Sequence, residues 1–412
     1  MIPLPRPAPA IFLALLALLP ACAPMEKREV TGALTYRPRI ALPPEAEVEV
    51  SAQGALGTRL GENRKATGGA QVPLPFTLSI PPGVSGTLQA VIHVQGQPRW
   101  LAEDLGFEAG SQPLDLGTVV LQPATPLDFA TRFSCGDTPA DFGVLDERAT
   151  LRVEDRKIPM RQEKAASGAR YVAEGGEDTV FWSKGDAAML RLQGRDLPEC
   201  TRADRPPPYR ASGNEPGWHV DVGAQRVQVV TDYGARTRSA PRPPIQTRAG
   251  GYRLDLPGIP ATLTLEETLC RDSATGMPHP HRAVLELPGQ RLQGCGGDPM
   301  ALLTGGPWRI EDVAGGGSID RSQIRITFDP RGRVTGSTGC NRFFGPYTLT
   351  GEGLTLGPLA TTMMACPQAL MDQERRVLQA LEAVRRFDRD ATGALRLMGE
   401  SGDTPLLTAR RP

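Results

Sequence analysis

The sequence has no excess of either charge, because its 46 lysines and arginines balance its 46 aspartates and glutamates over 412 residues. A neutral chain presents no broad basic field, which excludes a protein that binds nucleic acid through sequence-independent phosphate contacts. Long apolar runs are also missing. The run at residues 11–19 is shorter than the roughly 20 residues that a membrane-spanning helix needs, and no other stretch is long enough to cross a bilayer.

Turn-forming residues are abundant in this chain, and aromatic residues are few. The chain holds 46 glycines and 40 prolines, and only 5% of its residues are aromatic. This composition is typical of short strands joined by turns and extended linkers. Because one core accommodates about 100 to 150 residues, the length predicts three or four modules. We therefore expect a mainly β chain of four small modules and exclude a long helical bundle.

The N-terminus has the features of an export signal. Arg6 precedes the short apolar run, whose length fits the core of a signal peptide. Leu-Pro-Ala-Cys at residues 19–22 resembles the bacterial lipobox, which implies that residues 1–21 are removed and that Cys22 carries a lipid. The next residue, Ala23, implies placement in the outer membrane, facing the periplasm. The alternative is an ordinary cleaved signal in which Cys22 stays unmodified.

The six cysteines that follow Cys22 form an even number, as an oxidising compartment favours. The module boundaries proposed below put two cysteines in each of three segments. The favoured disulfides are therefore Cys135–Cys200, Cys270–Cys295 and Cys340–Cys366. A zinc site at His279 and His281 beside Cys270 is a weaker interpretation, because its spacing and compartment disfavour it. We expect no metal and no cofactor.

Residues 29–122 predict a β-sandwich, because short runs of alternating polar and apolar residues succeed one another. Val-Thr-Gly-Ala-Leu-Thr-Tyr at residues 30–36 and Leu-Pro-Phe at residues 74–76 resemble the YbaY family of lipoproteins, which is related to type III secretion lipoprotein chaperones. No cluster of titratable side chains supports a reaction, so we expect a binding or spacer role. The expected strands are Val30–Tyr36, Ala46–Ser51, Phe76–Ile80, Leu88–Val94 and Gly117–Leu121.

The second module, residues 129–201, carries the most informative motifs. Phe-Ser-Cys-Gly at residues 133–136, Ser-Gly-Ala-Arg-Tyr at 167–171 and Phe-Trp-Ser-Lys-Gly-Asp at 181–186 occur in order before a last cysteine. This order resembles the membrane-bound inhibitor of c-type lysozyme. The resemblance implies a small antiparallel β-barrel with two signature motifs, Ser-Gly-x-x-Tyr and Tyr-x-x-Lys-Gly. Phenylalanine stands here in place of the second tyrosine.

The chemistry of lysozyme explains how such motifs inhibit it. C-type lysozyme uses two carboxylates about 5 Å apart, one a proton donor of raised pKa and one a nucleophile. The ammonium of Lys184 is a compact charge on a long stem and the hydroxyl of Ser167 can donate a hydrogen bond, so the resemblance implies that both enter the cleft. Tyr171, Phe181 and Trp182 are expected to position the motifs. The expected lysozyme-binding residues are Ser167, Gly168, Tyr171, Phe181, Ser183, Lys184 and Gly185.

Residues 209–298 predict a third β module. The Pro-Pro-Pro hinge at residues 206–208 is stiff, because each ring fixes φ, and it predicts that the second and third modules have separate cores. Ser-Gly-Asn-Glu-Pro-Gly-Trp at residues 212–218, followed by Cys270 and by Gly-Cys-Gly-Gly at 294–297, resembles an uncharacterised envelope domain of unknown activity.

The last module, residues 302–410, resembles the META/HslJ domain. Pro-Trp-Arg-Ile at residues 307–310, Gly-Cys-Asn at 339–341 and Met-Ala-Cys at 364–366 carry the resemblance. That family is associated with envelope stress, heat and drug tolerance, and the resemblance implies an α+β domain.

One amphipathic helix is predicted over Gln368–Phe387, where apolar residues recur at helical spacing. We expect it to pack on the sheet with Glu374 on its outer side. Met363 and Met364, just before it, are expected to line the core or a groove, because flexible thioethers fill irregular gaps.

These patterns predict a non-catalytic lipoprotein, tethered through residues 22–28, that inhibits c-type lysozyme and so protects peptidoglycan. One competing hypothesis is an envelope stress or structural binding protein without lysozyme inhibition. The other is a hydrolase that uses cysteine and histidine, which six paired cysteines would leave without a nucleophile. Glu215 and His219 are more typical of a turn and a solvated strand than of a catalytic pair. The sequence predicts no oligomeric state.

Overall fold

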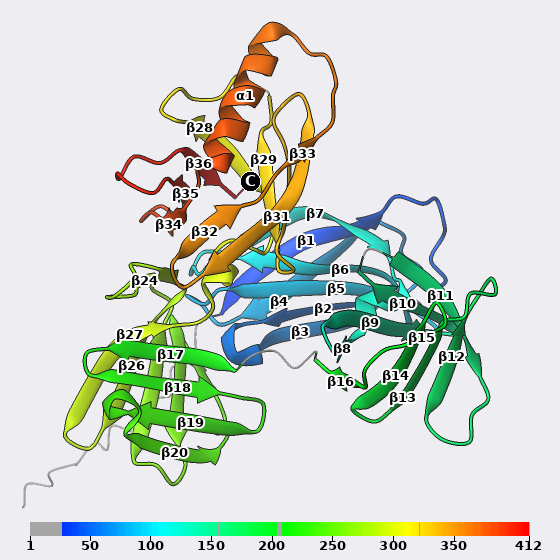
Figure 1. The fold of residues 1–412 in the computed structure, drawn as a ribbon, viewed down its shortest axis with the longest axis horizontal. Coiled ribbons are helices and arrows are strands. Elements are labelled where there is room, and N and C mark those ends of the chain that lie inside the picture. The colour runs from blue at the N-terminus through cyan, green and yellow to red at the C-terminus, as the bar shows by residue number, and fades with distance from the viewer. Residues whose placement is uncertain (1–26, 155, 204–207, 321, 412) are drawn as a thin grey trace, which may run out of the picture.

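The computed structural model describes residues 27–154, 156–203, 208–320 and 322–411. Strands form most of its regular structure, which confirms the mainly β prediction (Figure 1). The predicted signal peptide, the lipidation residue Cys22 and most of the proline hinge lie outside these described residues. Within them, no helix has the length and apolar character that crossing a membrane requires.

The first sheet has seven strands in the order β3-β2-β5-β6-β7-β1-β4. β1 pairs with β7 in parallel, and the other neighbours are antiparallel. The sheet curls until its end strands, β3 and β4, meet. A side chain at Gly61 would place its Cβ 2.6 Å from the carbonyl oxygen of Ser79, so glycine permits this approach. The strands are β1 (Arg28–Tyr36), β2 (Glu47–Gln53), β3 (Arg59–Ala66), β4 (Leu74–Ile80), β5 (Gly86–Val94), β6 (Gln97–Phe107) and β7 (Leu114–Pro123).

The second sheet closes into a barrel, because β13 pairs with β12 on one side and with β14 on the other. Phe142 lies at the centre of its core, with ring centroids 4.3 Å from Phe181 and 4.7 Å from Tyr171. This core is separate from that of the third sheet, as the hinge predicts. The strands are β8 (Thr131–Cys135), β9 (Thr138–Leu145), β10 (Arg148–Val153), β11 (Arg156–Glu163), β12 (Ala169–Ala173), β13 (Val180–Lys184), β14 (Ala187–Leu192), β15 (Arg195–Asp196) and β16 (Cys200–Arg202).

Asp141 links three neighbouring barrel strands. It lies in register between Arg132 on β8 and Arg152 on β10, and it accepts hydrogen bonds of 2.8 and 2.9 Å from their Nε atoms. Burial alone would raise the pKa of this carboxyl, but the bonds and charges of the two arginines outweigh burial and hold the pKa below its usual value.

Replacing Asp141 by asparagine should therefore lower the free energy of unfolding by about 1 to 2 kcal/mol at neutral pH, a modest figure because Arg132 is partly exposed. A carboxyl with a lowered folded-state pKa stabilises the fold above its unfolded pKa and loses that effect as pH falls through the folded pKa. Urea unfolding at pH 7 and at more acidic pH measures this. The difference between wild type and D141N should vanish on acidification.

Asp196 provides the matched control, because its carboxylate makes a similar two-bond contact with Arg191 on the exposed surface. The Asp196→Asn change should leave stability nearly unaltered. A D141N deficit that persists at acidic pH would contradict the electrostatic explanation.

The third sheet has the order β20-β19-β18-β17-β27-β26-β23-β22-β21, with a small β24-β25 ribbon beside it. Its apolar core is continuous with that of the first sheet. The Tyr252 hydroxyl accepts a 3.1 Å hydrogen bond from the Ala55 amide, across the junction. The strands are β17 (Tyr209–Asn214), β18 (Gly217–Val222), β19 (Arg226–Thr231), β20 (Arg236–Pro241), β21 (Gln246–Arg248), β22 (Gly251–Leu256), β23 (Ala261–Glu266), β24 (Cys270–Arg271), β25 (Pro278–His279), β26 (His281–Leu287) and β27 (Gln290–Gly296).

The fourth sheet carries α1 (Gln368–Glu382), the one α-helix among the described residues (Figure 1). Val377 and Leu381 of α1 are buried in the core of this sheet. The strands are β28 (Trp308–Val313), β29 (Arg325–Asp329), β30 (Arg333–Ser337), β31 (Arg342–Thr350), β32 (Gly353–Leu356), β33 (Ala360–Thr361), β34 (Arg386–Arg389), β35 (Leu395–Met398) and β36 (Leu407–Arg410). Short 3-10 turns occur at η1 (Ala55–Gly57), η2 (Pro126–Phe129), η3 (Asp232–Gly234) and η4 (Pro299–Leu302).

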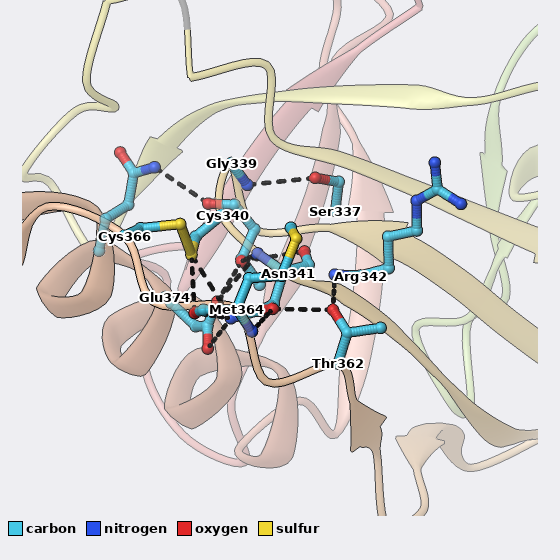
Figure 2. The surroundings of a disulfide bond; sticks show 11 residues. Ser337, Gly339, Cys340, Asn341, Arg342, Thr362, Met364, Cys366 and Glu374 are labelled. Carbon is cyan, nitrogen blue, oxygen red and sulfur yellow. Dashed lines mark hydrogen bonds between the residues drawn. A yellow bond between two sulfur atoms is a disulfide. The ribbon is translucent and has the colours of Figure 1, made fainter.

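Three predictions about this last domain are wrong. The helix ends before Phe387, which instead pairs with Leu397 in the β34–β35 hairpin. Glu374 faces inward, toward Asn341 (Figure 2), and its carboxylate accepts a 2.6 Å hydrogen bond from the Thr338 hydroxyl. Met363 and Met364 are 97% and 57% exposed, because the side chain of Asn341 binds the Met364 backbone and leaves both thioethers pointing outward.

The six cysteines of the described chain form three disulfides, which are the pairs that the sequence favours. Each joins segments of the same domain. The bonds are Cys135–Cys200, Cys270–Cys295 and Cys340–Cys366.

Candidate functional site

Two exposed loops meet at one edge of the barrel. The Trp182 indole on β13 donates a 2.8 Å hydrogen bond to the carbonyl oxygen of Ser167 in the loop before β12. Gly168 has a φ of 70°, and a Cβ there would collide with the carbonyl oxygen of Ser183. Glycine is therefore required for this close approach. The result brings the Ser167 loop against the end of β13, where Lys184 lies.

Lys184 is exposed at the end of β13, beside the turn at Gly185. Among the described residues its ammonium makes no ion pair and no side-chain hydrogen bond. Ser167 is exposed too, and Ser183 is half-buried. The arrangement thus presents a free cation and a hydroxyl on adjoining loops, both available to a partner.

Tyr171 and Phe181, two of the predicted site residues, lie inside the barrel. Phe181 is completely buried and Tyr171 is 8% exposed, because the two pair across β12 and β13 with both rings facing the barrel interior. Burial also raises the pKa of the Tyr171 hydroxyl. These rings lie behind the two loops, where a role in positioning the motifs would place them. Trp182 lies on the opposite face and positions the Ser167 loop, as expected.

A cavity of about 880 Å³ lies elsewhere, lined by residues of the first, third and fourth sheets. At its wall the Tyr209 hydroxyl lies 3.0 Å from His281 Nδ1, and Ser85 donates a 2.8 Å hydrogen bond to Glu267. Burial raises the pKa of Tyr209 well above its usual value, and it lowers that of Arg411 to about 10. None of the predicted lysozyme-binding residues lines this cavity.

A zinc site and a cysteine- or histidine-based active site are weakly supported in the part of the chain that the structure describes. No group of three or more metal-binding side chains occurs there. Cys270 is bonded to Cys295, so it offers no thiolate to a zinc ion beside His279. His219 is a residue of strand β18 and lies 3.8 Å from Asp221 on the same strand.

Comparison with known families assigns three of the domains. Residues 133–198 match the family described as membrane-bound lysozyme-inhibitor of c-type lysozyme, MliC. The chain contains an MliC domain. Residues 25–106 match the type III secretion system lipoprotein chaperone family, YscW, and residues 301–412 match the META domain. These matches confirm the resemblances found in the first, second and fourth modules.

The MliC domain supports a lysozyme-inhibitor role in the cell envelope and binding of c-type lysozyme. Together with the chaperone domain, it points to a membrane-associated envelope lipoprotein. Among solved structures, an alternative pilotin from the type II secretion system of Vibrio cholerae is 26% identical, over 24% of this chain and 99% of its own, with a TM-score of 0.20. The comparison with curated proteins gives no match.

The exposed surface around Trp182 extends beyond the signature motifs. Arg170 and Met189 flank Trp182 on the neighbouring strands; Arg170 fills a variable position of the Ser-Gly-x-x-Tyr motif, whereas Met189 belongs to no signature motif. The alternation of β14 is the signal that finds Met189, because Ala188 and Leu190 on either side of it are buried.

Proposed function

We propose that this chain is an envelope lipoprotein that blocks c-type lysozyme by placing Lys184 and Ser167 in the catalytic cleft. In this proposal Cys22 anchors the chain to the outer membrane by a lipid, and the barrel faces the periplasm. Lysozyme that enters this space meets the inhibitor before it degrades peptidoglycan. The protein acts as an inhibitor and not as an enzyme.

The single observation that carries the proposal is the meeting of the two motif loops at one exposed barrel edge. Trp182 ties the Ser167 loop to β13, and Lys184 follows two residues later on the same strand. The two functional side chains are therefore held together by the fold and need little ordering on binding, which favours affinity.

Charge explains why Lys184 is the main determinant in this proposal. The lysozyme cleft holds two carboxylates, and an ammonium placed between them neutralises the nucleophile and hinders the proton donor. Because no described acid of the chain pairs with Lys184, no internal ion pair has to be broken. Water is excluded when the cleft closes on the loop, and the attraction then strengthens.

The test is inhibition of c-type lysozyme by the mature full-length chain, purified in detergent, with lysis of a peptidoglycan suspension as the measurement. Lys184→Ala should raise the inhibition constant by at least about thirtyfold, which corresponds to about 2 kcal/mol, because it leaves a desolvated carboxylate unpaired. Ser167→Ala should have a smaller effect, of about fivefold, because it removes one hydrogen bond.

Lys157 supplies the matched control, since it is an exposed lysine of β11 near the end that is remote from the Ser167 loop. Lys157→Ala should inhibit like the wild type. Equal inhibition by K184A and wild type would reject the cleft mechanism. A wild-type chain that binds envelope proteins but does not inhibit lysozyme would favour the stress or structural role.

A further inference from the structure

A row of four side chains crosses the outer face of the barrel beside the motif loops. Glu163 on β11 pairs with Arg170 on β12, Arg170 pairs with Trp182 on β13, and Trp182 pairs with Met189 on β14. The neighbouring row, Tyr171, Phe181 and Leu190, is buried inside the barrel. Because successive residues of a strand face opposite sides, the row that holds Trp182 and Met189 points outward.

This row is apolar at one end and charged at the other. Met189 is 57% exposed, and Trp182 is half-buried with its indole N–H engaged by Ser167. Arg170 forms an ion pair with Glu163, which also pairs with Arg161, so this group carries one net positive charge. Exposed methionine and tryptophan beside an arginine form a composition that is enriched in protein interfaces.

The row is continuous with the proposed lysozyme contact. Trp182 and Lys184 are two residues apart on β13 and therefore project from the same face, about 7 Å apart. A specific protein interface covers about 800 Å² on each partner, which is far more than one lysine and one serine provide. A protein that receives Lys184 in its cleft therefore also covers Trp182 and Met189.

We propose that Met189, Trp182 and Arg170 form a second contact surface, on which the rim of the lysozyme cleft packs while Lys184 enters the cleft. This inference rests on the proposed function and adds the surface that excludes water from around the lysine. A ring of near-neutral contacts strengthens a central charged pair, because it removes the competing solvent. The protein that covers this surface is lysozyme, because the rest of the lysozyme molecule surrounds the cleft that receives Lys184.

The test compares three substitutions in the full-length chain by their inhibition constants against c-type lysozyme. Met189→Glu should raise the constant at least tenfold, because it removes apolar contact and places a carboxylate beside an acidic cleft. Met189→Leu, which retains an apolar side chain of similar size, should stay within about twofold of wild type. Val144→Glu is the matched control, because Val144 is 40% exposed on β9, which β10, β11 and β12 separate from β13.

The outcomes separate this inference from the proposed function. If M189E inhibits like wild type while K184A does not, the second surface is wrong and the cleft mechanism stands. If V144E is as weak as M189E, the effect is one of added charge and the second surface is again wrong. If the wild type does not inhibit, the proposed function and this inference both fail. Thermal unfolding of each variant identifies misfolding, in which case Met189→Ala, expected to weaken inhibition about threefold, decides the matter.

Discussion

A chain in which Cys135 and Cys200 are both replaced by alanine should lose its lysozyme inhibition at physiological temperature, because its barrel unfolds. The two cysteines are separated by 65 positions and enclose nearly the whole barrel. In the loop-entropy description, a bond that closes a loop of this length stabilises the fold by about 4 kcal/mol. A single core of about 70 to 80 residues rarely supplies more than about 3 to 5 kcal/mol, so the loss removes most of the barrel's stability.

Packing adds to that loss. Cys135 and Cys200 are 1% and 0% exposed and are register partners on β8 and β16, so alanine leaves a cavity at the seam of the barrel. Inhibition and unfolding of the full-length chain are the measurements. The double variant C270A/C295A is the matched control, because it opens a 25-position loop in the third sheet and should leave inhibition intact. Full inhibition by C135A/C200A would contradict the expected role of the bond.

The turn-rich composition was sufficient to predict the mainly β class, and the module boundaries, which put two cysteines in each of three segments, were sufficient to predict the disulfide pairs. Strand prediction in the first sheet was less complete, and β3 and β6 were missed. β3 contains charged residues along an exposed edge, such as Arg64 and Lys65, so it lacks the alternation that marks a half-buried strand. In β6 the alternation breaks at Asp104, whose φ is 54°.

The motifs name the candidate site residues, but they do not say which face of the barrel each side chain occupies. Phe181 was assigned to the lysozyme contact because it belongs to a signature motif, yet it is three residues from Lys184. An odd separation on a strand puts two side chains on opposite faces, so the period of the strand alone would have placed Phe181 inside once Lys184 was placed outside. The same rule places Met189, which no motif contains, on the outer face.

Contacts between domains could not be predicted from the sequence, because they depend on side chains that are distant along the chain. The first and third sheets share one apolar cluster, and Arg242 of the third domain donates a 2.6 Å hydrogen bond to the carbonyl oxygen of Leu56 in the first. Composition and spacing describe each segment separately. They do not reveal that Tyr252 and Ala55, nearly two hundred positions apart, meet across that junction.

The second large effect is expected from Asn341→Leu in the META domain. Asn341 is 4% exposed, and its amide joins three segments of the domain (Figure 2). The oxygen accepts 2.8 Å hydrogen bonds from the Met364 amide and the Thr362 hydroxyl, and the nitrogen donates to a Glu374 oxygen at 3.2 Å and to the Met364 carbonyl at 3.3 Å. Leucine has a similar volume but satisfies none of these groups.

The N341L variant should therefore lose about 4 kcal/mol of unfolding free energy, because the Met364 amide and a partly buried carboxylate are left without this partner, each at a cost of about 1 to 3 kcal/mol. Urea unfolding measures the loss, and hydrogen exchange at the Met364 amide should accelerate. Asn63→Leu is the control, since Asn63 makes an exposed side-chain bond to Thr77, and its effect should stay within about 0.5 kcal/mol.

Because the META core is separate from that of the barrel, N341L should inhibit lysozyme like wild type. Equal stability of N341L and N63L would show that the amide network is not what holds the Met364 loop.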